Sequence, residues 1–230
     1  GDEHLATVRL IEGWSYRKFR DALSQADGLK QITTQMTDAQ LMAELGSPGL
    51  APEGQFFPDT YSYAKGSTDL AVLQRAHRAM LKHVNEAWAA RSPSSPLRSP
   101  QDLLVLASII EKETGKPEER TRVAAVFVNR LRQRMKLQSD PTIIYGLVGG
   151  KGALGRPIMR SEIEQPTPYN TYVIDGLPPG PIANPGRAAL EAAANPARTK
   201  ELFFVADGTG GHAFSENYET HQKHVARLRA

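Results

Sequence analysis

Two glutamates, Glu111 and Glu113, close an apolar segment of the chain, and their spacing makes them candidates for proton transfer. A carboxyl group donates a proton at neutral pH only when its pKa is raised, and burial beside apolar residues raises it. At 100° per residue, Glu113 projects between Leu106 and Ile109 on an apolar stripe. Either acid is therefore a candidate general acid, although two acids that merely end a helix at the surface give the same pattern.

The segment that carries these acids has the signals of a buried helix. Ser99 is a good N-cap, Pro100 suits the first helical position, and Asp102 completes a variant of the capping box. Residues 103–110 are apolar on almost every side, which predicts a helix inside the protein. Gly115 is expected to end it in the left-handed conformation.

A second helix, opened by Pro117, is expected to pack on the first. Its largely apolar stripe comprises Val123, Val126, Phe127, Arg130 and Leu131. The polar residues 138–142 then lead into another helix, with Asp140 expected as its N-cap. Asp140 is also the nearest candidate in sequence for a second polar group beside the glutamates.

Seven segments resemble one known family in the same order along the chain. They are EGQFFPDTY (53–61), ASIIEKET (107–114), VAAVFVNRL (123–131), LQSDPTIIYG (137–146), PTPYNTY (166–172), GLPPGPI (176–182) and FFVADG (203–208). The family is MltG (YceG-like), whose members are endolytic murein transglycosylases. Its catalytic acid is the glutamate followed by threonine, so the resemblance implies that Glu113 is the catalytic residue.

The resemblance implies a lyase that cleaves the MurNAc–GlcNAc β-1,4 bond of peptidoglycan and leaves 1,6-anhydro-MurNAc ends. Such an enzyme is expected to terminate nascent glycan strands. Glu113 would act first as the acid and then as the base. Gln138, Asp140, Asn170 and Tyr172 are further candidates for binding the sugar or stabilising developing charge. No cofactor and no metal is expected.

Two other functions remain open from the residues. A muramidase-type hydrolase would need a second carboxylate or a held water, and Asp140 is the leading candidate for that carboxylate. A non-catalytic glycan-binding module would keep a groove but would not need a desolvated acid.

Composition narrows the class of protein. With 230 residues and 40% hydrophobic content, the chain can form one domain, or one domain with a small lobe. A net charge of +3 is modest, and the basic helix faces lack interleaved aromatic residues, so nucleic acid is not an expected partner. The chain has no cysteine, which excludes disulfides and thiolate metal sites.

The expected fold class is α+β, with a helical catalytic core, small β elements and an N-terminal strand–helix unit. Residues 1–50 are expected to form a small N-terminal α/β lobe, and residues 51–230 the catalytic transglycosylase domain. The expected elements are a strand at 4–11, helices from 15 and at 37–45, 67–91, 187–194 and 217–230, and a hairpin of strands 202–206 and 212–214.

Two segments outside these elements have alternative interpretations. Residues 47–58 are rich in glycine and proline and are expected to form a linker. Phe56, Phe57 and Tyr61 could line a sugar-binding groove or could pin a loop to the core. Residues 146–155 are dense in glycine but lack the phosphate-loop pattern, which predicts a plain loop.

The sequence contains no apolar run long enough to span a membrane and no signal peptide. The family carries an N-terminal membrane anchor and a LysM-like region. This chain is therefore expected to be a soluble fragment that acts at the periplasmic face of the bacterial inner membrane. Its expected partners are peptidoglycan glycan strands, with peptidoglycan synthases as a further candidate.

Overall fold

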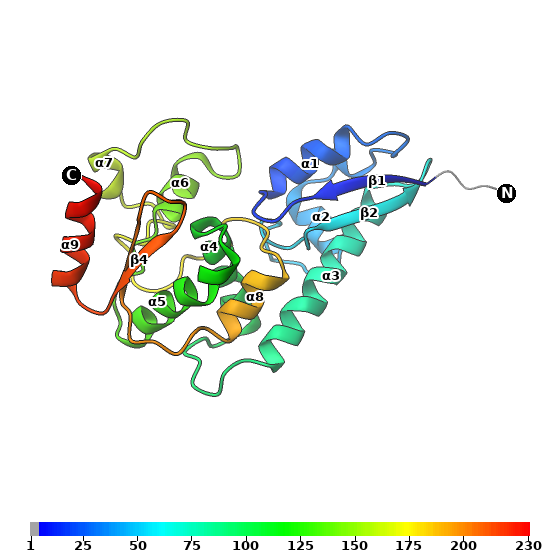
Figure 1. Ribbon diagram of the computed structural model, residues 1–230. Helices are drawn as coiled ribbons and strands as arrows, with labels where there is room; N and C mark the ends of the chain where they lie inside the picture. Colours follow the sequence, from blue (N-terminus) through cyan, green and yellow to red (C-terminus); the bar gives the residue numbers. More distant parts are fainter. Residues whose placement is uncertain (1–4) are drawn as a thin grey trace.

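The computed structural model describes residues 5–230, and it confirms the α+β fold class. Figure 1 shows the two-stranded sheet of β1 and β2 with its helices at one end of the molecule, and the helical body that contains α4 at the other. A second two-stranded sheet, β3 and β4, flanks that body together with α9. His4, expected in the first strand, lies outside the described residues.

The N-terminal unit is built on an antiparallel pair of strands. Strand β1 (Leu5–Leu10) pairs with β2 (Asp59–Ala64), with Leu5 opposite Ala64 and Leu10 opposite Asp59. The helical elements between them are α1 (Tyr16–Ser24), the short 3₁₀ helix η1 (Thr33–Gln35) and α2 (Asp38–Glu44). Because this pairing crosses residue 50, β2 packs with the lobe expected over residues 1–50; the two-domain division itself stays a prediction.

The expected linker at 47–58 is wrong for most of its length, because residues 52–58 are buried. Phe56 is fully buried and stacks on Tyr16, with ring centroids 5.5 Å apart. Phe57 stacks on His83 at 3.9 Å, and Tyr61 is also buried. These aromatic rings bury enough apolar surface to hold a glycine-rich loop in the core, so they do not line a groove.

Helix α3 (Asp69–Ala89) joins the two apolar cores of the molecule. Val72 and Leu73 in its first half belong to the core of the N-terminal unit, whereas Met80 and Val84 in its second half belong to the core around α4. The expected helix at 67–91 is thereby confirmed, and one continuous helix fixes the N-terminal unit against the helical body.

Helix α4 (Pro100–Glu113) is the centre of the helical body. The Ser99 hydroxyl accepts a hydrogen bond from the Asp102 amide at 3.1 Å, as the capping pattern predicts, and residues 103–110 are all buried. The expected ending at Gly115 is wrong. Thr114 ends the helix instead, because its extended backbone (φ −143°) breaks the helical hydrogen-bond series.

The remaining elements surround α4. They are η2 (Pro117–Glu119), α5 (Arg120–Arg132), α6 (Asp140–Val148), α7 (Arg160–Ile163), α8 (Arg187–Ala194), β3 (Phe203–Ala206), β4 (His212–Ser215) and α9 (Tyr218–Leu228). Strands β3 and β4 form the expected hairpin, with Phe203 opposite Ser215. Helix α6 continues through Gly146, so the glycine-rich loop starts later than the sequence pattern suggests. Among the described residues, no helix has the length and apolar character needed to cross a membrane.

Candidate active site

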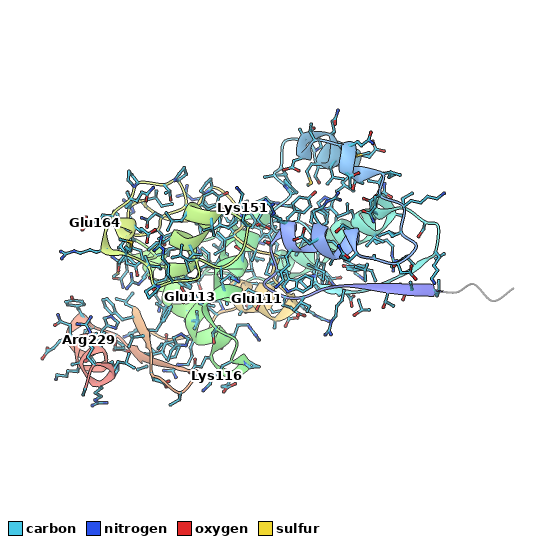
Figure 2. All side chains as sticks on the ribbon, turned by 90° about the horizontal axis from the view of Figure 1, so that it is seen from above. Glu111, Glu113, Lys116, Lys151, Glu164 and Arg229 are labelled. Atoms are coloured by element: carbon cyan, nitrogen blue, oxygen red, sulfur yellow. The ribbon has the colours of Figure 1, made fainter. Side chains whose placement is uncertain are left out.

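Glu113 is the last residue of α4, and Figure 2 shows it beside Glu111 at the end of that helix. Glu113 as a residue is half-buried, and protein atoms surround its carboxyl group. The Ser139 hydroxyl donates a hydrogen bond of 2.7 Å to Glu113 Oε1. Burial raises the pKa of Glu113 and the Ser139 hydrogen bond lowers it, while the negative charge of Asp140 adds a smaller increase, and the pKa that results is about 7. Protonated and ionised forms therefore coexist at neutral pH.

Ser139, and not Asp140 as expected, is the residue that precedes α6 as its N-cap. Ser139 is the N-cap residue of α6 and Asp140 is the first residue of the helix, so the predicted N-cap is wrong by one position. The Ser139 hydroxyl makes no capping bond because it is bonded to Glu113. The Ser139 amide donates to Thr171 Oγ1 at 2.8 Å, which fixes the loop from which the hydroxyl reaches Glu113.

Ser139→Ala is expected to raise the pKa of Glu113, because it removes a hydrogen bond that favours the carboxylate. A shift of about one unit corresponds to ~1.4 kcal/mol, the size of one hydrogen bond to a charged group. Carboxyl ¹³C NMR titration measures it. Thr142→Ser, which keeps a neighbouring hydroxyl, is the control. An unchanged or lowered Glu113 pKa in Ser139→Ala would contradict this account of the bond.

Asp140 and Tyr172 form a polar pair beside Glu113. The Tyr172 hydroxyl donates to Asp140 Oδ1 at 2.6 Å, while Asp140 itself is exposed. Burial and the neighbouring Asp140 carboxylate raise the pKa of Tyr172, so its hydroxyl remains a donor. The structure thus brings together three of the predicted site residues: Glu113 at the end of α4, Asp140 at the start of α6, and Tyr172.

Asp140→Asn should shift the pKa of Glu113 in the opposite direction to Ser139→Ala. The substitution removes the negative charge that raises the Glu113 pKa, while the asparagine oxygen can still accept from Tyr172. The same NMR titration should therefore show a lower Glu113 pKa. Asp175→Asn is a control, since Asp175 is exposed and pairs with Lys136 at 2.8 Å. A Glu113 pKa that rises in Asp140→Asn would refute the electrostatic coupling.

Gln138 is exposed in the same loop, in a conformation that few residues adopt. Its φ is +52°, in the left-handed region where residues other than glycine are uncommon. Its amide donates to Thr171 O at 3.2 Å, and Arg130 lies 3.5 Å from its Oε1. Gln138 is thus held beside Ser139 with its side chain open to solvent, where a ligand could meet it.

Asn170, another predicted site residue, is 1% exposed, and its side chain is hydrogen-bonded within the protein. Its amide donates to the Ile163 and Gln165 carbonyls at 2.9 and 2.8 Å, and its Oδ1 accepts from the Tyr172 amide at 2.9 Å. Sugar binding by Asn170 stays a prediction, and the described contacts give its side chain a structural role. Asn170 folds the turn that positions Tyr172.

Glu111 has a separate structural role. Burial raises its pKa, but its Oε1 accepts a hydrogen bond of 2.9 Å from the Gly186 amide. Gly186 is the N-cap residue of α8, so the Glu111 carboxyl satisfies a free amide at that helix start. Of the two acids at the end of α4, only Glu113 is hydrogen-bonded to Ser139, whereas Glu111 is hydrogen-bonded to the start of α8.

Sequence reasoning missed a third glutamate with a raised pKa, Glu53. Burial raises its pKa to about 7 as well, and it is 8% exposed. Its Oε2 accepts from the Tyr16 amide at 2.6 Å, and the Tyr145 hydroxyl forms a further hydrogen bond with it. Glu53 thereby connects the start of α1 to α6. The sequence did offer one signal for Glu53, because it is the first residue of the family-like segment EGQFFPDTY.

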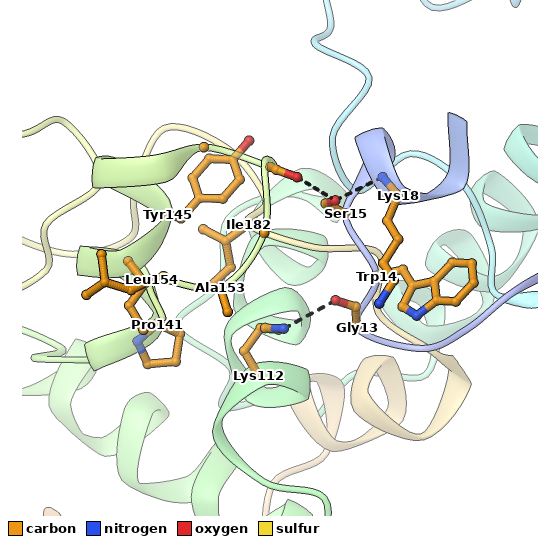
Figure 3. Close-up of a pocket in the computed structure, with 14 residues that line it drawn as sticks. Gly13, Trp14, Ser15, Lys18, Lys112, Pro141, Tyr145, Ala153, Leu154 and Ile182 are labelled. Atoms are coloured by element: carbon orange, nitrogen blue, oxygen red, sulfur yellow. Dashed lines mark hydrogen bonds between the residues drawn. The ribbon is translucent and has the colours of Figure 1, made fainter. Parts of the chain in front are cut away.

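A pocket of about 380 Å³ lies next to this site, between the start of α1, the end of α4 and α6. Figure 3 shows Lys112 and Pro141 on its wall. Glu113 does not line the pocket, but each of these two residues is a direct chain neighbour of a site residue. Residues 5–230 contain no group of three or more side chains that could hold a metal ion.

One enclosed carboxyl with a pKa near neutrality, a hydroxyl donor and a second carboxylate at its edge form a site for general acid–base chemistry. The body that carries them is helical, with a small sheet on either side. These features define an α+β protein with a single-glutamate acid site.

Comparison with known proteins identifies the family. Residues 1–227 match the YceG-like family, and the chain therefore belongs to it. An endolytic murein transglycosylase of Bacillus subtilis (strain 168) is 36% identical over 174 residues, which cover 74% of this chain and 46% of that protein. An endolytic murein transglycosylase of Streptococcus pneumoniae D39 is 36% identical over 180 residues, which cover 76% and 32%.

A solved structure agrees with the fold. The crystal structure of a yceG-like protein from Listeria monocytogenes has a TM-score of 0.76 and 28% identity to this chain, and the match covers 95% of this chain and 75% of that one. The chain spans less than half the length of the two curated relatives described above.

Proposed function

We propose that this chain is the catalytic part of an endolytic murein transglycosylase that cleaves the MurNAc–GlcNAc bond of peptidoglycan. The observation that carries the proposal is the enclosed Glu113 carboxyl, with a pKa of about 7, in a chain that is 36% identical to proteins of that name. A non-catalytic glycan-binding module has no use for such an acid, because desolvating it costs folding free energy.

In the proposed reaction, Glu113 donates its proton to the glycosidic oxygen as the C1–O bond breaks. The C6 hydroxyl oxygen of the same MurNAc forms a new bond to C1, and the Glu113 carboxylate takes the proton from that hydroxyl. The glutamate is thus returned to its starting state, and no water is consumed. One carboxyl serves as acid and then as base, unlike the two carboxyls of ordinary glycosidases.

The neighbours of Glu113 have roles that match these two steps. Ser139 donates to the carboxylate and stabilises it after the first proton transfer. Asp140 raises the pKa of Glu113 and so favours the protonated form before the reaction. Tyr172 holds Asp140 in place, and Gln138 lies exposed where it can contact a sugar hydroxyl.

The same geometry also supports a second candidate, a muramidase-type hydrolase. Asp140 is a carboxylate close enough to Glu113 to raise its pKa, so a second acid is present at the site. In the first proposal Asp140 only tunes Glu113, whereas in a hydrolase it would activate a water or attack the sugar.

Mass analysis of fragments released from purified peptidoglycan separates the two. The transglycosylase leaves 1,6-anhydro ends, so each product is one water lighter than a hydrolase product and has no reducing end. Products of Asp140→Asn should still be anhydro, even if fewer are formed. Reducing ends from the native chain, lost in Asp140→Asn, would establish the hydrolase instead.

The biological setting follows from the proposed reaction. An internal cut leaves a strand that ends in 1,6-anhydro-MurNAc and has no reducing end. Because synthesis cannot continue from such an end, we expect the protein to terminate nascent glycan strands. It would then work at the periplasmic face of the inner membrane, near peptidoglycan synthases.

A further inference from the structure

The pocket beside the site is not used by the proposed reaction, and its lining has a distinct chemistry. Its residues include Trp14, Lys18, Lys112, Tyr145 and Ile182, together with the glycines 149, 150 and 152. In Figure 3, Trp14 and Lys18 come from the start of α1, Lys112 from the end of α4, and Tyr145 from α6. The pocket therefore lies between the N-terminal unit and the helical body.

The charge of the lining is entirely positive. Lys18 and Lys112 are the only charged residues that line the pocket among those the structure describes, and neither forms an ion pair there with a described residue. The Lys18 ammonium lies 4.9 Å from the Trp14 ring centroid, and the Lys112 ammonium lies 3.4 Å from the Gly13 carbonyl oxygen. These contacts hold both ammonium groups at the pocket while leaving their charges available to an anion.

Hydrogen bonds across the pocket hold its two sides together. The Ser15 hydroxyl donates to the Gly150 carbonyl at 2.8 Å, which joins the start of α1 to the glycine-rich loop. Glu53 makes a second link through the Tyr16 amide and the Tyr145 hydroxyl. Glycine suits this close approach, because a Cβ at position 150 would lie 3.1 Å from Glu53 Oε1 and 3.2 Å from Ser15 Cβ, which is tighter than ordinary contacts. These contacts fix the two sides of the pocket relative to each other.

Two residues of the pocket lining are chain neighbours of candidate active-site residues. Lys112 precedes Glu113 on α4, and Pro141 follows Asp140 on α6. Because neighbouring Cα atoms are ~3.8 Å apart, a ligand at Glu113 has its adjoining groups within reach of the pocket.

We propose that this pocket binds a carboxylate-bearing peptide stem of the glycan strand, next to the bond that is cleaved. The inference rests on the proposed function, and it adds a recognition element to it. Sugar hydroxyl groups offer an ammonium group only neutral acceptors, whereas the peptide stem of peptidoglycan supplies carboxylates, which bind ammonium groups more strongly. The Trp14 face and the apolar side chains of the wall fit the aliphatic parts of the same peptide.

Calorimetric titration tests the inference with two soluble glycan oligosaccharides of equal length, one with peptide stems and one whose lactyl groups end in a neutral amide in place of the stem. All proteins carry Glu113→Gln so that the ligand stays intact. We expect the peptide-bearing ligand to bind about tenfold more tightly, the effect of ~1.4 kcal/mol from the two charged contacts. The Lys18→Met/Lys112→Met protein should lose this preference and bind both ligands alike, whereas Lys82→Met, at an exposed lysine of α3, should keep it.

Equal binding of the two ligands, no binding of either, or a preference that survives in Lys18→Met/Lys112→Met would overturn the inference. The single variants Lys18→Met and Lys112→Met serve if the double variant does not fold, and each should reduce the preference. Failure of the proposed function has a different readout, because the unmodified chain would then release no fragments from peptidoglycan of either kind.

Discussion

Glu113→Gln is expected to lower the release of peptidoglycan fragments by ~10²-fold or more, the usual contribution of a positioned general acid. Glutamine keeps the size of the side chain and can still accept a hydrogen bond from Ser139, but it has no carboxyl proton to give. Turnover is measured as anhydro ends formed per unit time, at equal concentrations of folded native and variant protein.

Glu111→Gln is the matched control, because Glu111 stands on the same helical turn but binds the Gly186 amide. It should leave turnover within a few-fold of the native value, with at most a modest loss of stability. Near-normal turnover in folded Glu113→Gln would remove Glu113 from the mechanism. A large loss in Glu111→Gln alone would move the acid to that position.

The same substitution, Glu113→Gln, is expected to stabilise the protein at neutral pH. Folding raises the pKa of Glu113 from 4.5 to about 7, so the folded state favours the protonated form. The resulting stability is fully present below pH 4.5 and is lost as pH rises through 7. Above that pH, the loss is on the order of 3 kcal/mol, from ~1.4 kcal/mol per pKa unit. Glutamine carries no such penalty.

Urea unfolding at pH 4.5 and at pH 8 measures this effect. The stability of Glu113→Gln relative to native should rise between the two pH values. Glu162→Gln provides a control with little pH dependence in this range: Arg156 lowers the Glu162 pKa from 4.5 to about 2, so its carboxylate stabilises the folded state at both pH values, and this stability is lost only as pH falls towards 2. A Glu113→Gln protein whose relative stability is independent of pH would contradict the raised pKa.

The buried acid helix was predictable because its signals are local. Ser99 and Pro100 mark its start, the apolar run at 103–110 predicts its burial, and the position of Glu113 on the apolar stripe predicts a raised pKa. Each of these depends on residues within a few turns of one another. The positions of the aromatic rings in residues 52–58 were harder to predict, because packing against residues distant in sequence decides whether a ring lines a groove or fills a core.

The polar contacts of the site were not predictable, because they join distant parts of the chain. Ser139 and Asp140 both precede Pro141 and both suit an N-cap, so sequence could not tell which would reach Glu113, 26 residues away. Asn170 is equally suited to bind a sugar or a carbonyl until the turn around it is known. Glu113 was predicted as the catalytic acid from the family resemblance, whereas its contacts with Ser139 and Asp140 became known only from the structure.

The central claim is that Glu113 holds a proton near neutral pH, and carboxyl ¹³C NMR titration of the native chain tests it most directly. Glu53 also has a pKa of about 7, so spectra of Glu113→Gln and Glu53→Gln are needed to assign the two signals. The account predicts a Glu113 signal that titrates near pH 7 and is absent only from Glu113→Gln. A Glu113 signal that titrates at or below the ordinary value of 4.5 would contradict it.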